Sequence, residues 1–331
     1  MGGIGLASYM EELILCRLLS GFAVAGLSTA STMMISDIST PLNRASTMAP
    51  VMSCFAAGMA LGPAIGGLLA DQIGVEPTFF VVSASFFSLT AVNQLLLRET
   101  KPKDYIFPWE KSTQNREVVK KSLSSSVTEA IAQWSPLMSN DRVKNVLVLN
   151  GIYWLALSGV QMTCLPLFLT DPSGPFCMGA TAVGQVYMGM SIVQVICNPG
   201  IAMLADKIGK TKAMVGGGSL LSMSIVAMTQ STDLIQLAAA MGFWTIGSTM
   251  LSTAPVAYIS DIVEAKKRAQ SIALLRTSGD LGFFVGAASI GMVGDLTGDL
   301  SLAMQTGGGI LFAGTSWYAA RQYLSEKLLK M

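Results

Sequence analysis

Nine apolar stretches, each about as long as a helix that crosses a lipid bilayer, constrain the fold of this sequence. A hydrocarbon core about 30 Å thick needs ~20 apolar residues in a helix. Only 12% of the residues are charged, against about 25% in soluble domains. We therefore predict an all-α integral membrane protein with about nine transmembrane helices. The stretches cover residues 13–35, 47–70, 79–97, 146–170, 183–204, 213–229, 234–259, 271–293 and 302–320.

The residue inventory excludes several kinds of chemistry. The chain has no histidine, which removes histidine-based metal sites, Ser-His-Asp or Cys-His catalysis and histidine proton relays. Its five cysteines form no C-x-x-C pair. No nucleophile–base constellation is visible, so we expect no enzyme, no cofactor and no metal site. A net charge of +1 gives no indication of a nucleic-acid partner.

One long polar stretch divides the apolar stretches into a group of three and a group of six. We expect residues 1–98 to form a partial N-terminal half with three transmembrane helices. Residues 99–144 are expected to be a cytoplasmic linker, and residues 145–331 a six-helix half with a cytoplasmic tail.

The charged residues predict the orientation in the membrane. Eight acidic residues outside the apolar stretches lie in alternate loops that contain no lysine or arginine, whereas 20 of the 21 basic residues lie in or next to the other loops. Positive residues favour the cytoplasmic side, so the linker and the C-terminus are predicted to be cytoplasmic. The acidic residues are Glu11, Glu12, Asp71, Glu76, Asp171, Asp233, Asp295 and Asp299.

An internal repeat appears when residues 30–74 are shifted by 224 positions onto residues 254–298. The ungapped match has 14 identities in 45 residues, concentrated in Gly, Asp and Arg, and none of them is the Leu or Val that shared hydrophobicity alone would match. A shorter D-x-x-G motif closes an apolar stretch at residues 71–74, 206–209 and 295–298. Both patterns indicate duplication and suit a transporter assembled from three-helix units.

Three motifs resemble the major facilitator superfamily. "GMALGPAIGG" is similar to the fifth-helix motif of its drug:proton antiporter branch, G-x8-G-x3-G-P-x2-G-G, although Ala49 replaces the first glycine. "RLLSGFAVAG" resembles the fourth-helix motif through Arg17 and Gly21, and "LADKIGKTK" resembles the signature loop, with Ala202 where glycine is usual. The residues that match the antiporter motif are Gly58, Gly62, Pro63, Gly66 and Gly67.

The resemblance implies a twelve-helix fold in two six-helix halves. The nine stretches then correspond to family helices four to twelve, and the first three helices are missing from this sequence. An incomplete gene model and a genuine nine-helix protein both explain that difference. Reading the DNA upstream of Met1 for three more apolar stretches separates them.

The implied function is secondary active transport of a small organic solute, with proton-coupled efflux by alternating access as the leading hypothesis. Proton-coupled or facilitative uptake of a metabolite or sugar is one alternative. A shortened membrane protein that binds a partner without transporting is another. We expect a monomer in the bilayer whose partners are the solute and a coupling proton.

Charges within the apolar stretches are candidates for coupling, because a charge in a membrane helix is costly and normally faces a partner or a water-filled cavity. Arg276 and Asp280 are four residues apart on one helix face. Asp280 lies about 14 Å from the start of its stretch at ~1.5 Å per residue. It is either a proton carrier or half of a static ion pair, and Arg17 either serves transport or extends its charge to the membrane surface.

The remaining candidates serve packing, gating or solute binding. The glycines and proline of 58–67 predict either a bendable seam against another helix or plain small-residue packing. Cytoplasmic charge pairs are expected to brace turns between helices, and amide and aromatic side chains could line the cavity or only anchor the membrane interface. The gating candidates are Asp37 with Arg44, Asp261 with Arg268, and Asp206 with Lys207, Gly209 and Lys210. The candidates for cavity lining are Asn150, Tyr153, Trp154, Gln161, Gln194 and Trp244.

Overall fold

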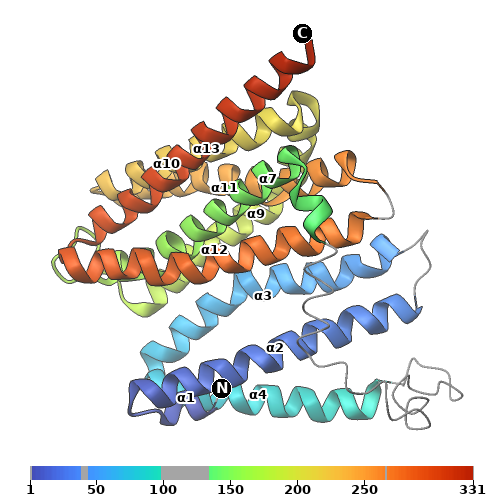
Figure 1. Ribbon diagram of the computed structural model, residues 1–331. Coiled ribbons are helices and arrows are strands. Elements are labelled where there is room, and N and C mark those ends of the chain that lie inside the picture. The colour runs from blue at the N-terminus through green and yellow to red at the C-terminus, as the bar shows by residue number, and fades with distance from the viewer. Residues whose placement is uncertain (1, 39–43, 98–133, 265–266, 331) are drawn as a thin grey trace, which may run out of the picture. The chain divides into compact units, whose positions relative to one another are not determined.

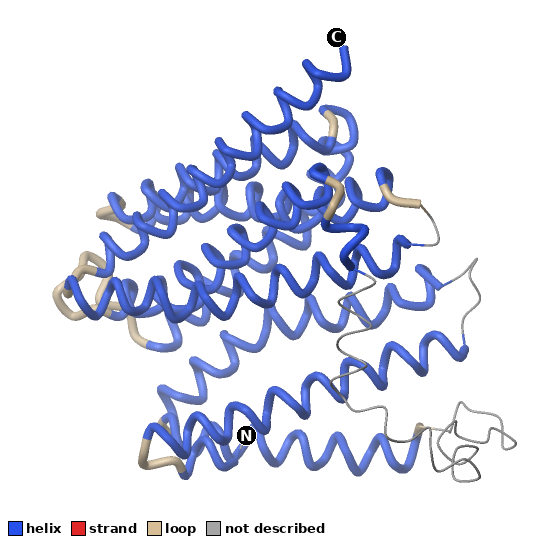
Figure 2. Tube along the Cα trace, in the orientation of Figure 1, coloured by secondary structure: helices blue, strands red, loops and turns tan. Residues whose placement is uncertain are grey.

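The protein is all-helical in the part that the structure describes. The computed structural model describes residues 2–38, 44–97, 134–264 and 267–330, and every regular element within these residues is a helix (Figure 2). This confirms the predicted fold class. The helices, labelled in Figure 1 where there is room, are α1 (Gly2–Leu6), α2 (Met10–Ile38), α3 (Arg44–Ile73), α4 (Val75–Leu96), α7 (Asp141–Ala156), η1 (Leu157–Cys164), α8 (Leu165–Thr170), α9 (Ala180–Ile208), α10 (Lys210–Gln230), α11 (Leu234–Ile262), α12 (Arg268–Thr297) and α13 (Leu300–Lys330).

Six helices of the described part are long and apolar enough to cross a membrane. All nine predicted stretches fall in helical segments, except for Leu97, which directly follows the last residue of α4. The count of nine spans stays a prediction, since length and composition identify six. The six are Val75–Leu96, Asp141–Thr170, Ala180–Cys197, Lys210–Gln230, Leu234–Ile262 and Gln270–Thr297.

The chain forms two compact units. The first unit contains residues 1–120 together with 179–189, and the second contains residues 121–178 and 190–331. Helix α9 therefore begins in the first unit and continues into the second. The domain boundaries inferred from the sequence remain a prediction.

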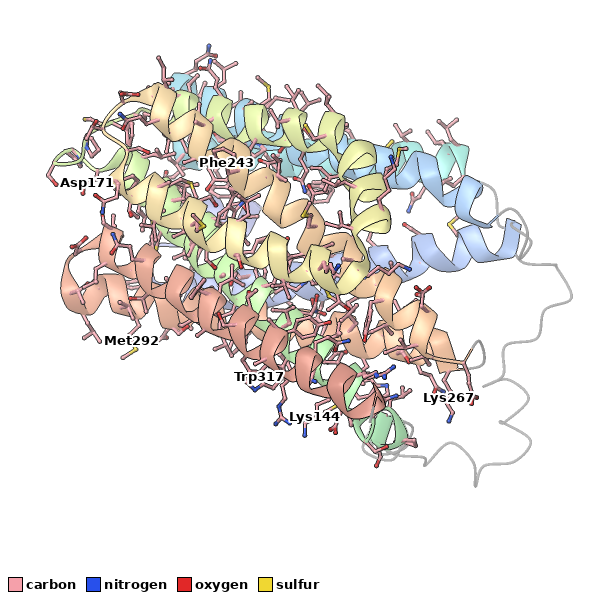
Figure 3. All side chains as sticks on the ribbon, turned by 90° about the horizontal axis from the view of Figure 1, so that it is seen from above. Lys144, Asp171, Phe243, Lys267, Met292 and Trp317 are labelled. Carbon is pink, nitrogen blue, oxygen red and sulfur yellow. The ribbon has the colours of Figure 1, made fainter. Side chains whose placement is uncertain are left out.

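The core of the second unit lies among α7, η1, α10, α11, α12 and α13. Tyr153, Trp244 and Tyr318 are its largest fully buried side chains. Figure 3 shows Asp171 toward one end of these helices and Lys144 and Lys267 toward the other. This separation of acidic and basic ends fits a bundle whose two ends face different sides of a membrane.

Three glycines end or begin helices in a backbone conformation that other residues avoid. Gly74, Gly209 and Gly298 have φ angles of 88°, 92° and 67°, and they are the only glycines of the described part with positive φ. Each is the last residue of a D-x-x-G motif. The motif therefore recurs because, at each of these three places, a helix must stop and the chain must turn.

The helix boundaries reproduce the internal repeat. A shift of 224 residues carries Met10–Ile38 onto Leu234–Ile262, and Arg44–Ile73 onto Arg268–Thr297. The same shift carries Gly74 onto Gly298, so the duplicated motifs occupy the same places on duplicated helices. α3 and α12 are therefore two copies of one helix in two different settings.

Candidate functional site

Arg276 and Asp280 lie near the middle of α12, the helix that carries the two membrane charges of the second unit. α12 has 30 residues, and Asp280 is the thirteenth of them. Both side chains are exposed, and within the described residues no ion pair joins them or links either to another side chain. The geometry therefore gives no support to a static ion pair and leaves the carboxylate of Asp280 accessible.

The opposite side of α12 packs against α7 at backbone distance. A β-carbon on Gly282 would lie under 3.0 Å from the carbonyl oxygen of Gly151, and one on Gly286 equally close to that of Leu155. The Ser158 hydroxyl donates a hydrogen bond to the carbonyl of Phe283 at 2.7 Å. Only glycine allows this approach, so the two helices form a tight seam that fixes which face of α12 remains open.

Asn150 and Trp154 strengthen that seam from α7. The Asn150 amide donates to the Leu275 carbonyl at 2.9 Å and to the Ser278 hydroxyl at 3.1 Å. Trp154 lies beside Gly279, and its ring centroid is 6.3 Å from that of Phe283. These predicted cavity residues thus hold α7 to the helix that bears Asp280.

The other predicted cavity residues are distributed differently. Tyr153 and Trp244 are each 2% exposed, and the Tyr153 hydroxyl shares a 2.9 Å hydrogen bond with that of Ser248 on α11. Gln161 is half-buried, whereas Gln194 is exposed on α9. The interior of the second unit therefore contains Tyr153 and Trp244, and solute lining by this set stays a prediction.

A π-helical segment, η1, interrupts the helix that continues from α7 and was not anticipated from the sequence. It covers Leu157–Cys164 and includes Gln161. The Thr163 hydroxyl donates to the carbonyl of Ser158, five residues earlier, at 2.9 Å. Such segments are frequent at functional sites, but the run "LSGVQMTC" shows no local signal that would have located it.

The antiporter-type motif on α3 makes few contacts. Added β-carbons on Gly58, Gly62 and Gly66 would meet no described atom within 4 Å, whereas one on Gly67 would lie under 3.0 Å from the carbonyl oxygen of Ala180. A β-carbon on Gly184 would likewise lie under 3.0 Å from the carbonyl oxygen of Pro63. Both contacts are with the first part of α9, inside the first unit.

Arg17 lies on an open face of α2. Its side chain is exposed, and within the described residues it forms no ion pair. It lines a hollow of about 580 Å³ together with the apolar side chains of its own helix. The exposed guanidinium is compatible with both readings of Arg17, a role in transport and an extension toward the membrane surface. The other lining residues are Leu13, Ile14, Leu18, Gly21 and Phe22.

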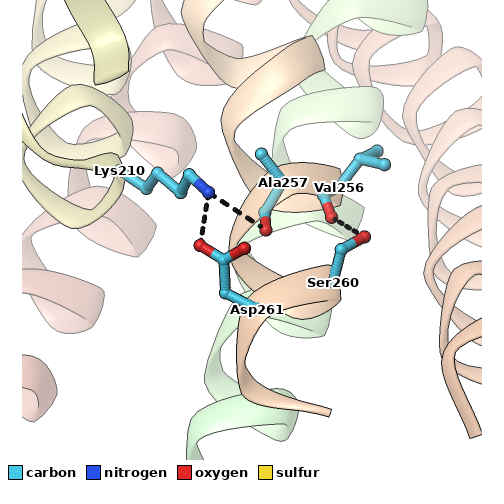
Figure 4. A network of polar contacts seen from close by, with 5 residues as sticks. All are labelled: Lys210, Val256, Ala257, Ser260 and Asp261. Carbon is cyan, nitrogen blue, oxygen red and sulfur yellow. Dashed lines mark hydrogen bonds and ion pairs between the residues drawn. The ribbon is translucent and has the colours of Figure 1, made fainter. Parts of the chain in front are cut away.

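One ion pair joins two of the predicted gating residues. Lys210, the first residue of α10, pairs with Asp261 near the end of α11 and also donates to the carbonyl of Ala257 at 3.5 Å (Figure 4). From the sequence, Lys210 was grouped with Asp206, its neighbour along the chain. Asp261 is 51 residues away and comes within reach of Lys210 through the packing of α10 on α11. This pair links two helices at the end predicted to be cytoplasmic.

The remaining gating candidates have few described contacts. The side chains of Asp37, Arg44, Asp206 and Arg268 lie outside the described part of the structure. Lys207 is exposed, and Gly209, with its positive φ, is the N-cap residue that directly precedes α10. Among the described residues, no group of three or more cysteine, aspartate or glutamate side chains is arranged to hold a metal ion.

Comparisons with known proteins identify relatives along most of the chain. It is 22% identical over 286 residues to the uncharacterized MFS-type transporter MJ1560 of Methanocaldococcus jannaschii, covering 86% of this chain and 68% of that protein. It is 24% identical over 246 residues to multidrug resistance protein MdtG of Proteus mirabilis, covering 74% of this chain and 54% of MdtG. The chain thus spans about half the length of this multidrug relative.

Solved transporters share the fold. A bacterial homolog of the human lysosomal transporter Spinster matches with a TM-score of 0.67 and 16% identity, covering 96% of this chain and 78% of that one. A peptide transporter, POT, matches with a TM-score of 0.68 and 13% identity, covering 96% and 76%. The family model of the Major Facilitator Superfamily matches residues 1–174 and 152–327. The chain belongs to the major facilitator superfamily of membrane transport proteins.

Proposed function

We propose that this transporter exports a small organic solute by alternating access, driven by protons that Asp280 carries. The observation that supports the proposal most directly is the position of Asp280: an exposed carboxylate in the middle of a 30-residue helix, with no ion-pair partner in the described structure. An acidic side chain at such depth is costly and marks an ion or proton pathway in transport proteins.

The surroundings of Asp280 suit a proton carrier. The tight seam with α7 holds one side of α12, so Asp280 keeps its place on the open side when helices move. Arg276, one turn away, supplies a positive charge that can approach or leave the carboxylate. A carboxylate whose surroundings change in this way can take up a proton on one side of the membrane and release it on the other.

Export is supported by the motif on α3 and by the named relatives. "GMALGPAIGG" is similar to the motif of the drug:proton antiporter branch, and several of the similar proteins, MdtG of Proteus mirabilis among them, are named multidrug resistance proteins. Uptake of a metabolite is the second candidate.

The separation of Lys144 and Lys267 from Asp171 supports a cytoplasmic linker and C-terminus.

Transport in proteoliposomes tests the proposal. The probe is ethidium, a fluorescent amphipathic cation, with a pH-sensitive dye that reports proton movement in the same vesicles. Under an imposed pH gradient, Asp280→Asn is expected to lower ethidium transport more than tenfold and to abolish the coupled proton flux. Exchange of ethidium without a gradient is expected to remain, because it needs no net protonation.

A matched control is Asp295→Asn, which makes the same change at the end of the same helix. It is expected to transport like the wild type. If Asp280→Asn transports as well as wild type under the gradient, the proton-carrier role is lost. If the wild type moves ethidium only inward, the uptake alternative replaces export.

A further inference from the structure

We propose that Asp71 is a latch that holds the end of α3 against the first turn of α9 and keeps this helix pair closed on the non-cytoplasmic side. This inferred role rests on the proposed function, because closing a helix pair affects transport only if the transporter alternates between two open states. The contact itself lies within the first unit of the structure.

The latch begins with an antiparallel crossing of two helices. On α3, Pro63, Gly67 and Asp71 are spaced four residues apart and share one face. On α9, the contacts run in the opposite order, from Gly184 back to Ala180 and Thr181. At both glycines the neighbour is backbone, so a side chain larger than hydrogen would separate the helices.

Asp71 closes the end of this crossing. Its carboxylate accepts a hydrogen bond from the backbone amide of Thr181 at 2.8 Å, in the first turn of α9. The first amides of a helix have no partner inside the helix, and the helix dipole favours a negative charge there. α9 has no acidic residue in its first turn, so the capping group comes from α3.

The repeat shows that the sequence alone does not create this contact. Asp295 is the copy of Asp71 and has the same place at the end of α12, yet within the described residues it accepts no hydrogen bond from another helix. The aspartate is thus common to both copies, and in the described part of the structure it caps a second helix from α3 and not from α12.

Distances between spin labels test the latch directly. Labels are attached to cysteines that replace Gln72 on α3 and Gln185 on α9, both exposed, in the full protein with its native cysteines replaced, held in lipid nanodiscs. Loss of a helix-capping side chain typically changes an equilibrium about fivefold. Asp71→Ala is therefore expected to raise the ratio of separated to adjacent labels about fivefold.

Two further variants separate a latch from a general structural effect. Asp71→Asn keeps an oxygen acceptor and is expected to cause a smaller rise than Asp71→Ala. Gly184→Leu leaves Asp71 intact but forces the backbones apart, so it is expected to give at least as large a rise. Asp295→Ala is the matched control and is expected to leave the distances unchanged.

The latch proposal is overturned if Asp71→Ala leaves the label distances at their wild-type values, or if Asp295→Ala shifts them equally. No solute or proton gradient enters this measurement. If Asp280→Asn fails to affect transport while Asp71→Ala still separates the labels, the proton-carrier role falls and the latch stands. Unchanged distances beside proton-coupled ethidium export give the opposite result.

Discussion

α3 and α12 are copies of one helix, yet they use the same glycines in opposite ways. Gly282 and Gly286 of α12 lie against the backbone of α7, whereas their counterparts Gly58 and Gly62 on α3 have no neighbour among the described residues. Toward the end of the helix the relation reverses. There Gly67 is in backbone contact with α9. A β-carbon on Gly291, in contrast, would lie 3.5 Å from the Thr163 side chain, which is an ordinary van der Waals distance. A glycine pattern thus provides a face for close packing, and the neighbouring helix decides whether that face is used.

The proline that distinguishes the copies supplies the test with the largest expected effect. Ala287→Pro places in α12 the residue that α3 has as Pro63. The ring would clash with the carbonyl of Phe283, which also accepts the Ser158 hydrogen bond. Thermal unfolding in detergent, followed by tryptophan fluorescence, is expected to show a loss of ~3 kcal/mol or more. Pro63→Ala is the reciprocal control and is expected to retain wild-type stability.

The next test exchanges glycine for valine at equivalent places. Gly286→Val forces a side chain into the Leu155 carbonyl and is expected to destabilise the second unit by about 1–3 kcal/mol. Gly62→Val meets open space and is expected to change little. The same unfolding measurement compares the two variants. Equal losses would contradict the comparison and would mean that something outside the described residues covers the face of Gly62.

The smallest expected effect concerns pH and the latch. Hydrogen bonds from the Thr181 hydroxyl and amide lower the pKa of Asp71 below its ordinary value of 3.8. A carboxylate with a lowered pKa stabilises the contact above pH 3.8 and loses that contribution as pH falls below this value. The surrounding loops contain Glu76 and Asp171 but no lysine or arginine. The label distances on α3 and α9 are therefore expected to stay constant between pH 5 and pH 8.

A change in those distances within that range would mean that another group controls the contact. Asp71→Asn, whose side-chain amide does not ionise in this pH range, is the control for this measurement. A constant distance would separate the two acidic residues by role, with Asp71 holding a helix pair and Asp280 available for the coupling proton.

Much of the local structure could be predicted because it depends on short-range physics. Membrane helices can be recognised in a sequence by the length and hydropathy of an apolar stretch. Each D-x-x-G motif ends at a glycine with a positive φ, a backbone conformation that other residues avoid. The repeat in the sequence aligns α3 with α12 residue by residue, and the helix boundaries agree with that alignment. Asp280 was identified because a carboxylate in an apolar stretch is rare.

The site contacts could not be predicted in the same way. Lys210 pairs with Asp261, 51 residues away, and Asp71 caps a helix 110 residues further along the chain. Asn150 was expected to line a cavity, and it donates its hydrogen bonds to α12. Each partner is chosen by which helices pack together, and no local spacing contains that information.

The sequence by itself determined the helical membrane fold, the turns that end its repeated units and the two copies of one glycine-rich helix. These features depend on apolar length, charge distribution and backbone sterics, which involve residues close together in the chain. They can therefore be predicted from the sequence. Only the tertiary structure decided that α7 packs on the glycines of α12, that α9 packs on the end of α3, and that Asp280 stays exposed. Packing is a property of pairs of helices, and an identical face can be covered in one place and open in another.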